Sequence, residues 1–484
     1  MTPHQVVDEA AQPIPGQSRP APDARGAAHR PAGSASQRPD AELLIAASVL
    51  LADAAVTAKQ TGAELTDALS SWRLGLAALT RPAWAIGTAV SCAKALTSPS
   101  GLGFAPNGGV LGELARMAGS VTYRRPAAVA MAVDAFALRI EAAVVEHPNL
   151  DSALARRLTD AMVDGNRWEA LRALHALVER LGLTRALTTI SPVMMELLAL
   201  LGLLDENPVN DGFSWVTLAG GVPTTDPFLG LPSSVLRYLN PGPGRAERVE
   251  PDSILADVLA TSRNDIVSYA NDIGTLGNHG LVLLRRIACT DGRVKYVLLL
   301  PGTSFGLPSN STPQDLVGAF DGALRSDTTY TRAVRRLLRR AGVPAGSELM
   351  FVGHSLGGLT AMNLAADVEL ASTYRITHVV TLGSPIDNKR PADHTTQVVS
   401  LVNKHDVIPM LDGRGPASPQ DIPAGWVELS WLDTSYDYPL SHAPQAYSAT
   451  LRGEMAGYRD RVNELIAAYD GEVVGNQPYM LRDK

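Results

Sequence analysis

The chain has 484 residues, 45% of them hydrophobic and 19% charged, with a formal net charge of −7. This length exceeds one ordinary domain, so the sequence predicts two structured parts and a tail. The acidic balance leaves no broad basic surface, which argues against nucleic acid as a partner. The two cysteines, Cys92 and Cys289, are too few for a disulfide framework or a zinc site and are typical of a reducing cytoplasm.

Residues 1–40 are rich in Pro, Gly, Ala, Ser and Arg and show no apolar period. Such a segment cannot bury enough surface to offset the entropy of ordering it, so we expect a disordered tail. It contains no basic stretch followed by an apolar core, and therefore no recognisable signal peptide. These features predict a cytoplasmic protein and leave secretion by a signal-less route open.

Residues 41–245 form the second predicted part, a region of alanine- and leucine-rich helical segments whose role the sequence does not reveal. Its two most apolar stretches, Glu42 to Ala58 and Ser191 to Leu204, are interrupted by Asp53 and Glu196. Both are shorter than the roughly 18 apolar residues of a membrane-spanning helix, so we expect them to be buried helices. Further helices are predicted over residues 41–79, 126–145 and 150–183.

Pro223 to Pro251 is dense in proline and glycine and reads as a linker or surface loop. Beyond it, residues 246–484 alternate between apolar strands and helices, which predicts a mainly parallel sheet covered on both faces. The strand pattern opens with Gly280 to Ala288 and Val294 to Leu300. Asp291-Gly292 between them predicts a hairpin.

A short strand, Glu348 to Val352, leads directly into Gly353-His354-Ser355-Leu356-Gly357-Gly358, which begins the next predicted helix. This strand–turn–helix context makes the G-x-S-x-G pattern informative. A sharp elbow exposes the Ser355 hydroxyl, and its close neighbours Gly353 and Gly357 must lack side chains. The sequence therefore predicts Ser355 as a nucleophile on an α/β-hydrolase fold.

A nucleophilic serine needs a histidine base and a carboxylate that holds this base in one tautomer. In this fold the chain order is serine, acid, histidine, which selects His442 as the base. Asp406 is the preferred acid because it follows the predicted strand Gln397 to Val402, at the carboxyl end of the sheet. Asp387 is the runner-up, and other aspartates remain open, namely Asp367, Asp393, Asp412, Asp421, Asp433 and Asp437.

The oxyanion hole requires two backbone donors. The amide of Leu356, directly after the nucleophile, supplies one. The strand Val294 to Leu300 ends in Pro301-Gly302-Thr303, where the glycine permits a turn over the site, and Thr303 is predicted to supply the second. The segment Ser304 to Thr312, directly after this turn, is either a lid over the site or an ordinary connecting loop.

Taken together, these residues resemble the class 3 (fungal-type) lipases. The motifs that carry the resemblance are Gly302-Thr303, Gly353 to Gly358, Gly383-Ser384-Pro385, Asp406 to Pro409 and His442. They cover about residues 280–447. One departure is Pro301, which stands where the family usually has arginine. The resemblance implies an acylglycerol or phospholipid substrate.

The sequence thus predicts a serine hydrolase that cleaves carboxylic esters without a cofactor or metal ion, and the resemblance implies that these are lipid esters. Transient contact with a lipid surface is compatible with this function. Two alternatives remain open. The same three residues could act on a non-lipid ester, a thioester or in acyl transfer, or the helical region could bind a partner while the hydrolase part is a vestigial scaffold.

Overall fold

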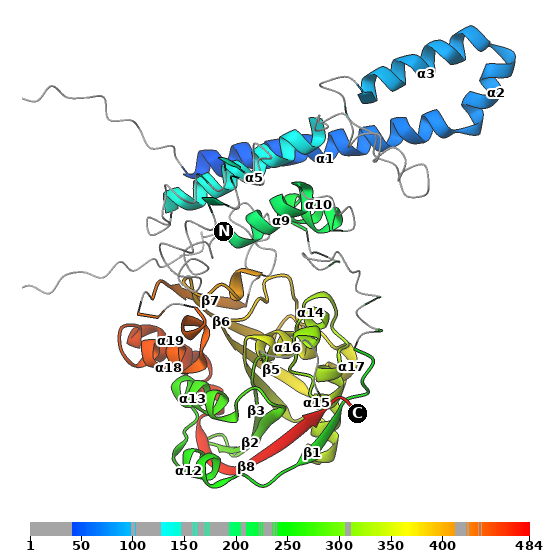
Figure 1. Ribbon diagram of the computed structural model, residues 1–484. Coiled ribbons are helices and arrows are strands. Elements are labelled where there is room, and N and C mark those ends of the chain that lie inside the picture. The colour runs from blue at the N-terminus through cyan, green and yellow to red at the C-terminus, as the bar shows by residue number, and fades with distance from the viewer. Residues whose placement is uncertain are drawn as a thin grey trace, which may run out of the picture. The chain divides into compact units, whose positions relative to one another are not determined.

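The structure is a computed structural model of the chain, shown in Figure 1. It describes residues 41–97, 127–146, 193–204, 210–221, 240–304, 311–411, 425–433 and 438–484, with isolated positions between them. The predicted tail (1–40) and nearly all of the predicted helix at 150–183 lie outside the described residues.

The described part of residues 240–484 contains one eight-stranded sheet, with the strand order β1-β8-β2-β3-β4-β5-β6-β7. The strands are β1 (Arg245–Arg248), β2 (Leu281–Cys289), β3 (Val294–Leu300), β4 (Glu348–His354), β5 (Arg375–Leu382), β6 (Gln397–Asn403), β7 (Trp426–Trp431) and β8 (Gly471–Arg482). Strands β3 to β7 pair in parallel, whereas β1, β8, β2 and β3 pair antiparallel. The sheet is therefore mixed.

The predicted hairpin between β2 and β3 is confirmed. Ala288 pairs with Val294, and the turn is closed by the amide of Gly292 donating to the carbonyl oxygen of Cys289 at 2.9 Å. Gly292 has a φ of 78°, which a residue with a Cβ adopts only at a cost. The Asp-Gly pair is thus the local signal that fixes this turn.

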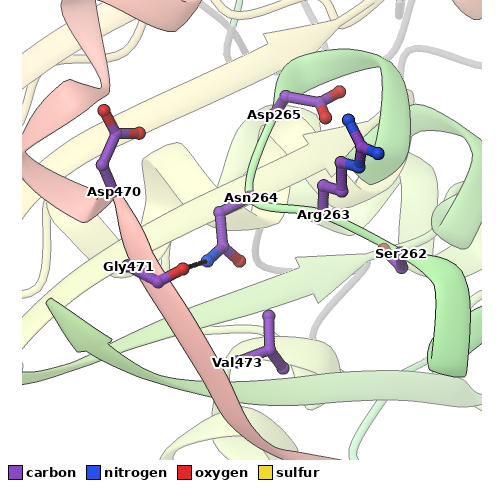
Figure 2. Close-up of a pocket in the computed structure, with 7 residues that line it drawn as sticks. All are labelled: Ser262, Arg263, Asn264, Asp265, Asp470, Gly471 and Val473. Atoms are coloured by element: carbon purple, nitrogen blue, oxygen red, sulfur yellow. Dashed lines mark hydrogen bonds between the residues drawn. The ribbon is translucent and has the colours of Figure 1, made fainter.

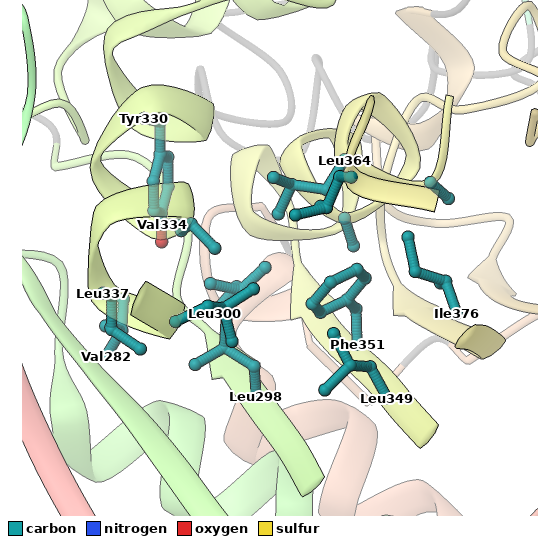
Figure 3. Close-up of a cluster of buried hydrophobic side chains, with 14 of the residues drawn as sticks. Val282, Leu298, Leu300, Tyr330, Val334, Leu337, Leu349, Phe351, Leu364 and Ile376 are labelled. Atoms are coloured by element: carbon teal, nitrogen blue, oxygen red, sulfur yellow. The ribbon is translucent and has the colours of Figure 1, made fainter. Parts of the chain in front are cut away.

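Helices cover the sheet on both faces (Figure 1). One buried cluster joins the sheet to the helices around the nucleophile strand. Figure 3 shows Leu300 of the sheet near Val334, and Phe351 below Leu364. The helices on this face are α14 (Leu316–Leu324), α15 (Thr329–Arg340), α16 (Leu356–Ala365) and α17 (Val368–Thr373). The second cluster joins the sheet to α12 (Ser253–Thr261), α13 (Ile266–Leu276), α18 (Pro444–Arg452) and α19 (Ala456–Leu465).

The segment predicted as a linker, Pro223 to Pro251, is not a loop throughout, because its residues 245–248 form β1 and pair with β8. This edge is held by α15. Its Arg332, Arg336 and Arg340 donate to the carbonyl oxygens of Gly242, Gly244 and Ala246. The pairing could not be read from the sequence because β1 is only four residues long and mostly polar.

The described helices before residue 240 are α1 (Ala41–Ser70), α2 (Trp72–Thr80), α3 (Pro82–Thr97), α5 (Ala127–Glu146), α9 (Met194–Leu204) and α10 (Asp211–Leu218). Helix α1 packs along α5, and their buried alanines form a third apolar cluster with α9. Ser71 separates α1 from α2 because its hydroxyl accepts from the amide of Leu74 and caps a new helix.

The two most apolar helices have different environments. Helix α9 is buried, as predicted for this segment. Helix α1 was also expected to be buried, and this expectation is wrong: only 22% of its most apolar window is buried. Its segment Ala41–Leu69 is long and apolar enough to cross a membrane, judged by length and a mean hydropathy of 1.8.

A buried charge stabilises the end of α10. Both terminal nitrogens of Arg139 on α5 donate to the carbonyl oxygens of Thr217 and Leu218, at 3.2 and 2.7 Å. These carbonyls belong to the last turn of α10, where a cation compensates the helix dipole. Burial raises the pKa of the neighbouring Glu196 carboxyl, which the positive charge of Arg139 partly opposes.

Candidate active site

The nucleophile elbow lies between β4 and α16. Ser355 has φ 55° and ψ −125°, and it is the one non-glycine residue with a positive φ in the described part of the chain. This conformation costs roughly 1–3 kcal/mol for a residue with a side chain, so the surrounding structure must enforce it. Ser355 directly precedes α16, and the amide of Leu356 is the first of the helix, with no acceptor inside it.

Three glycines permit the elbow because other atoms occupy the space of their side chains. A Cβ on Gly353 would lie 2.4 Å from the backbone of Gly357, and a Cβ on Gly357 would lie 1.9 Å from the carbonyl oxygen of Leu300. A Cβ on Gly358 would lie 2.1 Å from Oγ of Ser384. The run of glycines in the sequence is therefore explained by close packing of β3, β4 and β5 against the start of α16.

The predicted base and acid are in contact. His442 Nδ1 lies 2.7 Å from Asp406 Oδ2, and both side chains are at least 95% buried. The other carboxylate oxygen of Asp406 accepts from the amide of Ile408 at 3.0 Å. Because an ionised carboxylate can only accept, Nδ1 carries the proton in this pair and Nε2 is left as the basic nitrogen.

Tyr447 on α18 is a third group at this carboxylate, and no sequence motif pointed to it. Its hydroxyl donates to Asp406 Oδ2 at 2.8 Å. Burial, followed by the charge of Asp406, raises the pKa of Tyr447 well above its usual value, so the hydroxyl keeps its proton. A Cβ on Gly383, which has a φ of 58°, would lie 2.7 Å from the same carboxylate oxygen. The glycine of the Gly383-Ser384-Pro385 motif therefore leaves room for Asp406.

This contact favours Asp406 over the other candidate acids. Asp433, the nearest alternative in sequence that the structure describes, instead accepts from the Thr450 hydroxyl and the Ser435 amide. Among the described residues, Asp406 is the carboxylate that contacts His442, so Asp387 does not fill this position. Asp412, Asp421 and Asp437 lie outside the described residues.

His354, the residue before the nucleophile, connects the elbow to the histidine loop. Its Nε2 lies 2.6 Å from the backbone oxygen of His442, and the centroids of the two rings are 4.5 Å apart. A carbonyl oxygen can only accept, so Nε2 carries the proton. Burial, followed by the proximity of His442, lowers the pKa of His354 well below its usual range, so the ring is neutral.

The catalytic hydrogen bond itself is not formed in this structure. His442 Nε2 is buried and has no hydrogen-bond partner among the described residues, so it makes no hydrogen bond with Ser355 Oγ. Such bonds are often long in an enzyme without substrate and shorten when substrate binds. The structure thus brings Ser355 and His442 into one buried neighbourhood through His354, with Nε2 available to accept a proton.

The turn after β3 lies against the nucleophile, as the oxyanion prediction requires. A Cβ on Gly302 would lie 2.7 Å from the Cβ of Ser355. The next residue, Thr303, is buried, and its carbonyl oxygen accepts from the side chain of Asn278 at 2.9 Å. Asn278 lies two residues after the end of α13, and this hydrogen bond fixes the backbone of Thr303 at the site.

A second contact fixes the same turn from the other side. The amide of Ser304 donates to the backbone oxygen of Gln314 at 2.7 Å, and the Gln314 side chain donates to the Tyr330 hydroxyl. Tyr330 in turn donates to the carbonyl oxygen of Pro301 at 3.1 Å. The chain between these contacts belongs to the segment Ser304 to Thr312, the candidate lid or loop, of which residues 305–310 lie outside the described residues.

A surface pocket exists elsewhere in this domain. Figure 2 shows it between the turn before α13 and the start of β8, lined by Arg263, Asn264 and Asp470 among others. Gly471, which lines the pocket, pairs with Cys289 at the end of β2, directly before the turn that leads into β3. It therefore lies at the amino ends of the parallel strands, whereas Ser355 and Asp406 follow their carboxyl ends. Ligands in α/β sheets bind at the carboxyl ends, so this pocket does not belong to the site.

The fold and the elbow define the C-terminal half as an α/β-hydrolase. Residues 315–415, which contain Ser355 and Asp406, match the family model of the lipases of class 3. The resemblance to class 3 lipases is therefore confirmed for this part of the chain, and the family assigns it a general activity, the hydrolysis of lipid esters. The match ends before His442 and begins after Thr303. No curated protein and no solved structure matches the chain.

Proposed function

We propose that the protein cleaves lipid esters of the acylglycerol or phospholipid type through an acyl-enzyme formed on Ser355. The observation that carries this proposal is the buried contact of 2.7 Å between His442 Nδ1 and Asp406 Oδ2, beside a serine in a strained elbow. Such an arrangement serves nucleophilic catalysis, because it leaves Nε2 to accept the serine proton.

The reaction follows from the roles of these groups. Ser355 Oγ attacks the ester carbonyl while His442 Nε2 takes its proton, and the carbonyl oxygen becomes an oxyanion. The amides of Leu356 and Thr303 stabilise this charge. His442 then returns the proton to the leaving alcohol, Asp406 stabilises the imidazolium, and water releases the acyl group by the same path.

Esters of p-nitrophenol with graded acyl chains test this function, with Ser355→Ala as the inactive control. We expect kcat/KM to rise with chain length, because a longer chain buries about 0.8 kcal/mol per methylene in an apolar pocket. Release of fatty acid from triacylglycerol and from phospholipid, measured by titration, then separates the two substrate types. Activity confined to acetyl esters or to thioesters would contradict the lipid assignment.

A further inference from the structure

Helices α2 and α3 form a hairpin that exposes large apolar side chains on more than one side. The two helices contact each other, and their inner face is made of small residues around the buried Ala85 and Leu96. Six large apolar side chains are exposed on the outside, and we call them the hairpin surface: Trp72, Leu76, Leu79, Trp84, Ile86 and Val90.

The exposure of these side chains is unusual for residues of their size. Trp72 is 70% exposed, Leu79 81% and Trp84 60%. On α2, Trp72 and Leu76 are four residues apart and Leu79 follows three later, so these three lie on one side of the helix. On α3 the same spacing puts Trp84 on a different side of the helix from Ile86 and Val90. The contiguous apolar patch is therefore the one on α2, and a contiguous exposed patch marks a binding surface.

The charge of the hairpin is opposite to that of the whole chain. Residues 71–97 contain Arg73, Arg81 and Lys94 and no aspartate or glutamate, in a chain with a net charge of −7. Arg73 lies over the ring of Trp72, with Cζ 6.0 Å from the ring centroid. Both tryptophans are therefore within one helical turn of an arginine, since Trp84 is three residues from Arg81.

We propose that the hairpin surface binds an anionic phospholipid bilayer. Tryptophan prefers the boundary between headgroups and acyl chains, and leucine, isoleucine and valine gain free energy when they enter the acyl region. The arginines and the lysine then meet the negative headgroups, so both the apolar and the charged parts of the hairpin are complemented by one partner.

The dimensions favour a hairpin that lies in the interface over one that spans the bilayer. At 1.5 Å per residue, α2 is about 14 Å long and α3 about 24 Å, whereas a hydrocarbon core is about 30 Å thick. The longer helix α1 packs along α5 and carries Asp53, Lys59, Glu64 and Asp67, which oppose its transfer into lipid.

A second copy of the chain is a poorer partner for the same surface. Two hairpins packed face to face would bring together two groups of three positive charges with no acidic residue between them. Like charges that are brought close together repel each other, whereas an anionic bilayer attracts each of them. The charge of the hairpin thus selects the lipid.

The proposal is independent of the proposed catalytic function, because it concerns residues that lie outside the catalytic group. Binding is measured with the full-length Ser355→Ala variant, which cannot hydrolyse the lipid, by sedimentation with vesicles of phosphatidylglycerol and phosphatidylcholine. We expect binding to vesicles that contain phosphatidylglycerol, and at least tenfold weaker binding to pure phosphatidylcholine or at 0.5 M salt, since added salt screens the charges.

Two variants in the same background locate the contact. Trp72→Ser combined with Leu79→Ser and Trp84→Ser should lower the partition coefficient at least a hundredfold. Replacing Arg73, Arg81 and Lys94 by glutamine should lower it at least tenfold, because each basic residue contributes roughly fivefold. Circular dichroism checks that both variants keep their helices, and the glutamine variant still tests the proposal if the serine variant loses them.

A matched control carries Ile254→Ser and Val368→Ser, which remove side chains that are 70% and 74% exposed on the hydrolase part. This control should bind vesicles as the parent does. Equal binding to phosphatidylcholine alone, unchanged binding of both hairpin variants, or an equal loss in the control would overturn the proposal. With Ser355 restored, the hairpin variants should hydrolyse a short water-soluble ester at the normal rate, and loss of that rate would also contradict it.

Discussion

At the residue scale, the site is organised around one buried carboxylate. Asp406 is fully buried and accepts hydrogen bonds from His442, Tyr447 and the amide of Ile408. Such a group holds the imidazole of His442 in a single tautomer and orientation. Two donors besides His442 make this carboxylate a rigid support rather than a mobile counter-ion.

Replacing Asp406 by asparagine should lower turnover by up to roughly 10⁴-fold, because an amide lets His442 adopt the wrong tautomer. The shape of the side chain is kept, so the circular dichroism spectrum should not change. Asp387→Asn is the matched control and should be mild. If Asp387→Asn lowers turnover strongly and Asp406→Asn does not, Asp406 is not the acid.

His354 should act by positioning His442. His354→Phe keeps a ring but removes the Nε2–H donor to the His442 carbonyl oxygen, and we expect kcat to fall ten- to a hundredfold with KM unchanged. His354→Gln retains a donor and should recover part of the loss. An increase in KM with constant kcat would instead indicate contact with substrate.

The pH dependence of kcat/KM tests whether the ring of His354 is neutral. Because burial lowers the pKa of His354 well below 6.5, this ring stays neutral through the pH range in which a normal histidine titrates. The acidic limb of kcat/KM should therefore fit one ionisation, and His354→Phe should leave the number of ionisations unchanged. Two ionisations on that limb would contradict a neutral His354.

The sequence could indicate Ser355 and its glycines because their geometry is set within six consecutive residues. The partners of the oxyanion turn could not be found in the same way. Asn278 reaches Thr303 across 25 residues, and Tyr330 reaches Pro301 across 29. Neither residue stands in a pattern that distinguishes it from an ordinary helical or loop residue.

At the element scale, the ends of β3, β4 and β5 converge on the start of α16, and small residues permit this approach. Gly383 directly follows β5 with a φ of 58°, and a Cβ there would meet Asp406 and Tyr447. Side chains at such points would move the strand ends apart and separate the reactive groups. The glycines are therefore part of the support of the site.

Gly383→Ala should both destabilise the fold and lower turnover at least tenfold, because the new methyl group would displace Asp406. Gly342→Ala is the control, since Gly342 has a φ of 68° but open space around its Cβ position. The control should lose about 1–2 kcal/mol of stability from backbone strain alone. Thermal unfolding and kcat measured on both variants separate strain from contact, and equal activity in the two would refute the contact.

Strands with continuous apolar runs could be predicted, and strands with polar or broken patterns could not. Strands β2, β3, β4 and β6 lie where the sequence placed them. The twelve-residue strand β8 contains Gly475 and Pro478 and was missed, as were β1 and β7. Strand β8 pairs with β2 over a separation of about 190 residues, as in the pair Arg285 and Asn476. No turn or hairpin motif in the neighbouring sequence could therefore predict this pairing. The helix predicted after Ser355 is α16, and a second helix, α17, follows it because Asp367 caps a new helix start.

At the scale of the whole molecule, the described core has three apolar clusters. One contains residues between 52 and 218, and the other two contain residues between 246 and 481. The groups of the candidate active site belong to the latter range. The helical region contributes the hairpin surface, which the composition of the sequence did not reveal because exposure depends on packing.

The pH dependence of stability should carry the signature of Asp321, a buried carboxyl in α14. Burial raises its pKa to about 6, with Arg325 opposing the shift. The folded state therefore binds more protons than the unfolded state between about pH 4 and pH 6, and stability falls as the pH rises through this window, by at most about 3 kcal/mol. Asp321→Asn should remove this fall in the thermal midpoint. An identical pH slope in the variant would contradict the assignment.

The central claim is that Ser355 is a nucleophile activated by His442. The most direct test is labelling of the full-length protein with a fluorophosphonate, followed by mass spectrometry of the labelled peptide. The account predicts one label per chain, on Ser355, with no labelling of Ser355→Ala and labelling at least a hundredfold slower in His442→Ala. A label on another residue, or a labelled Ser355→Ala variant, would contradict it.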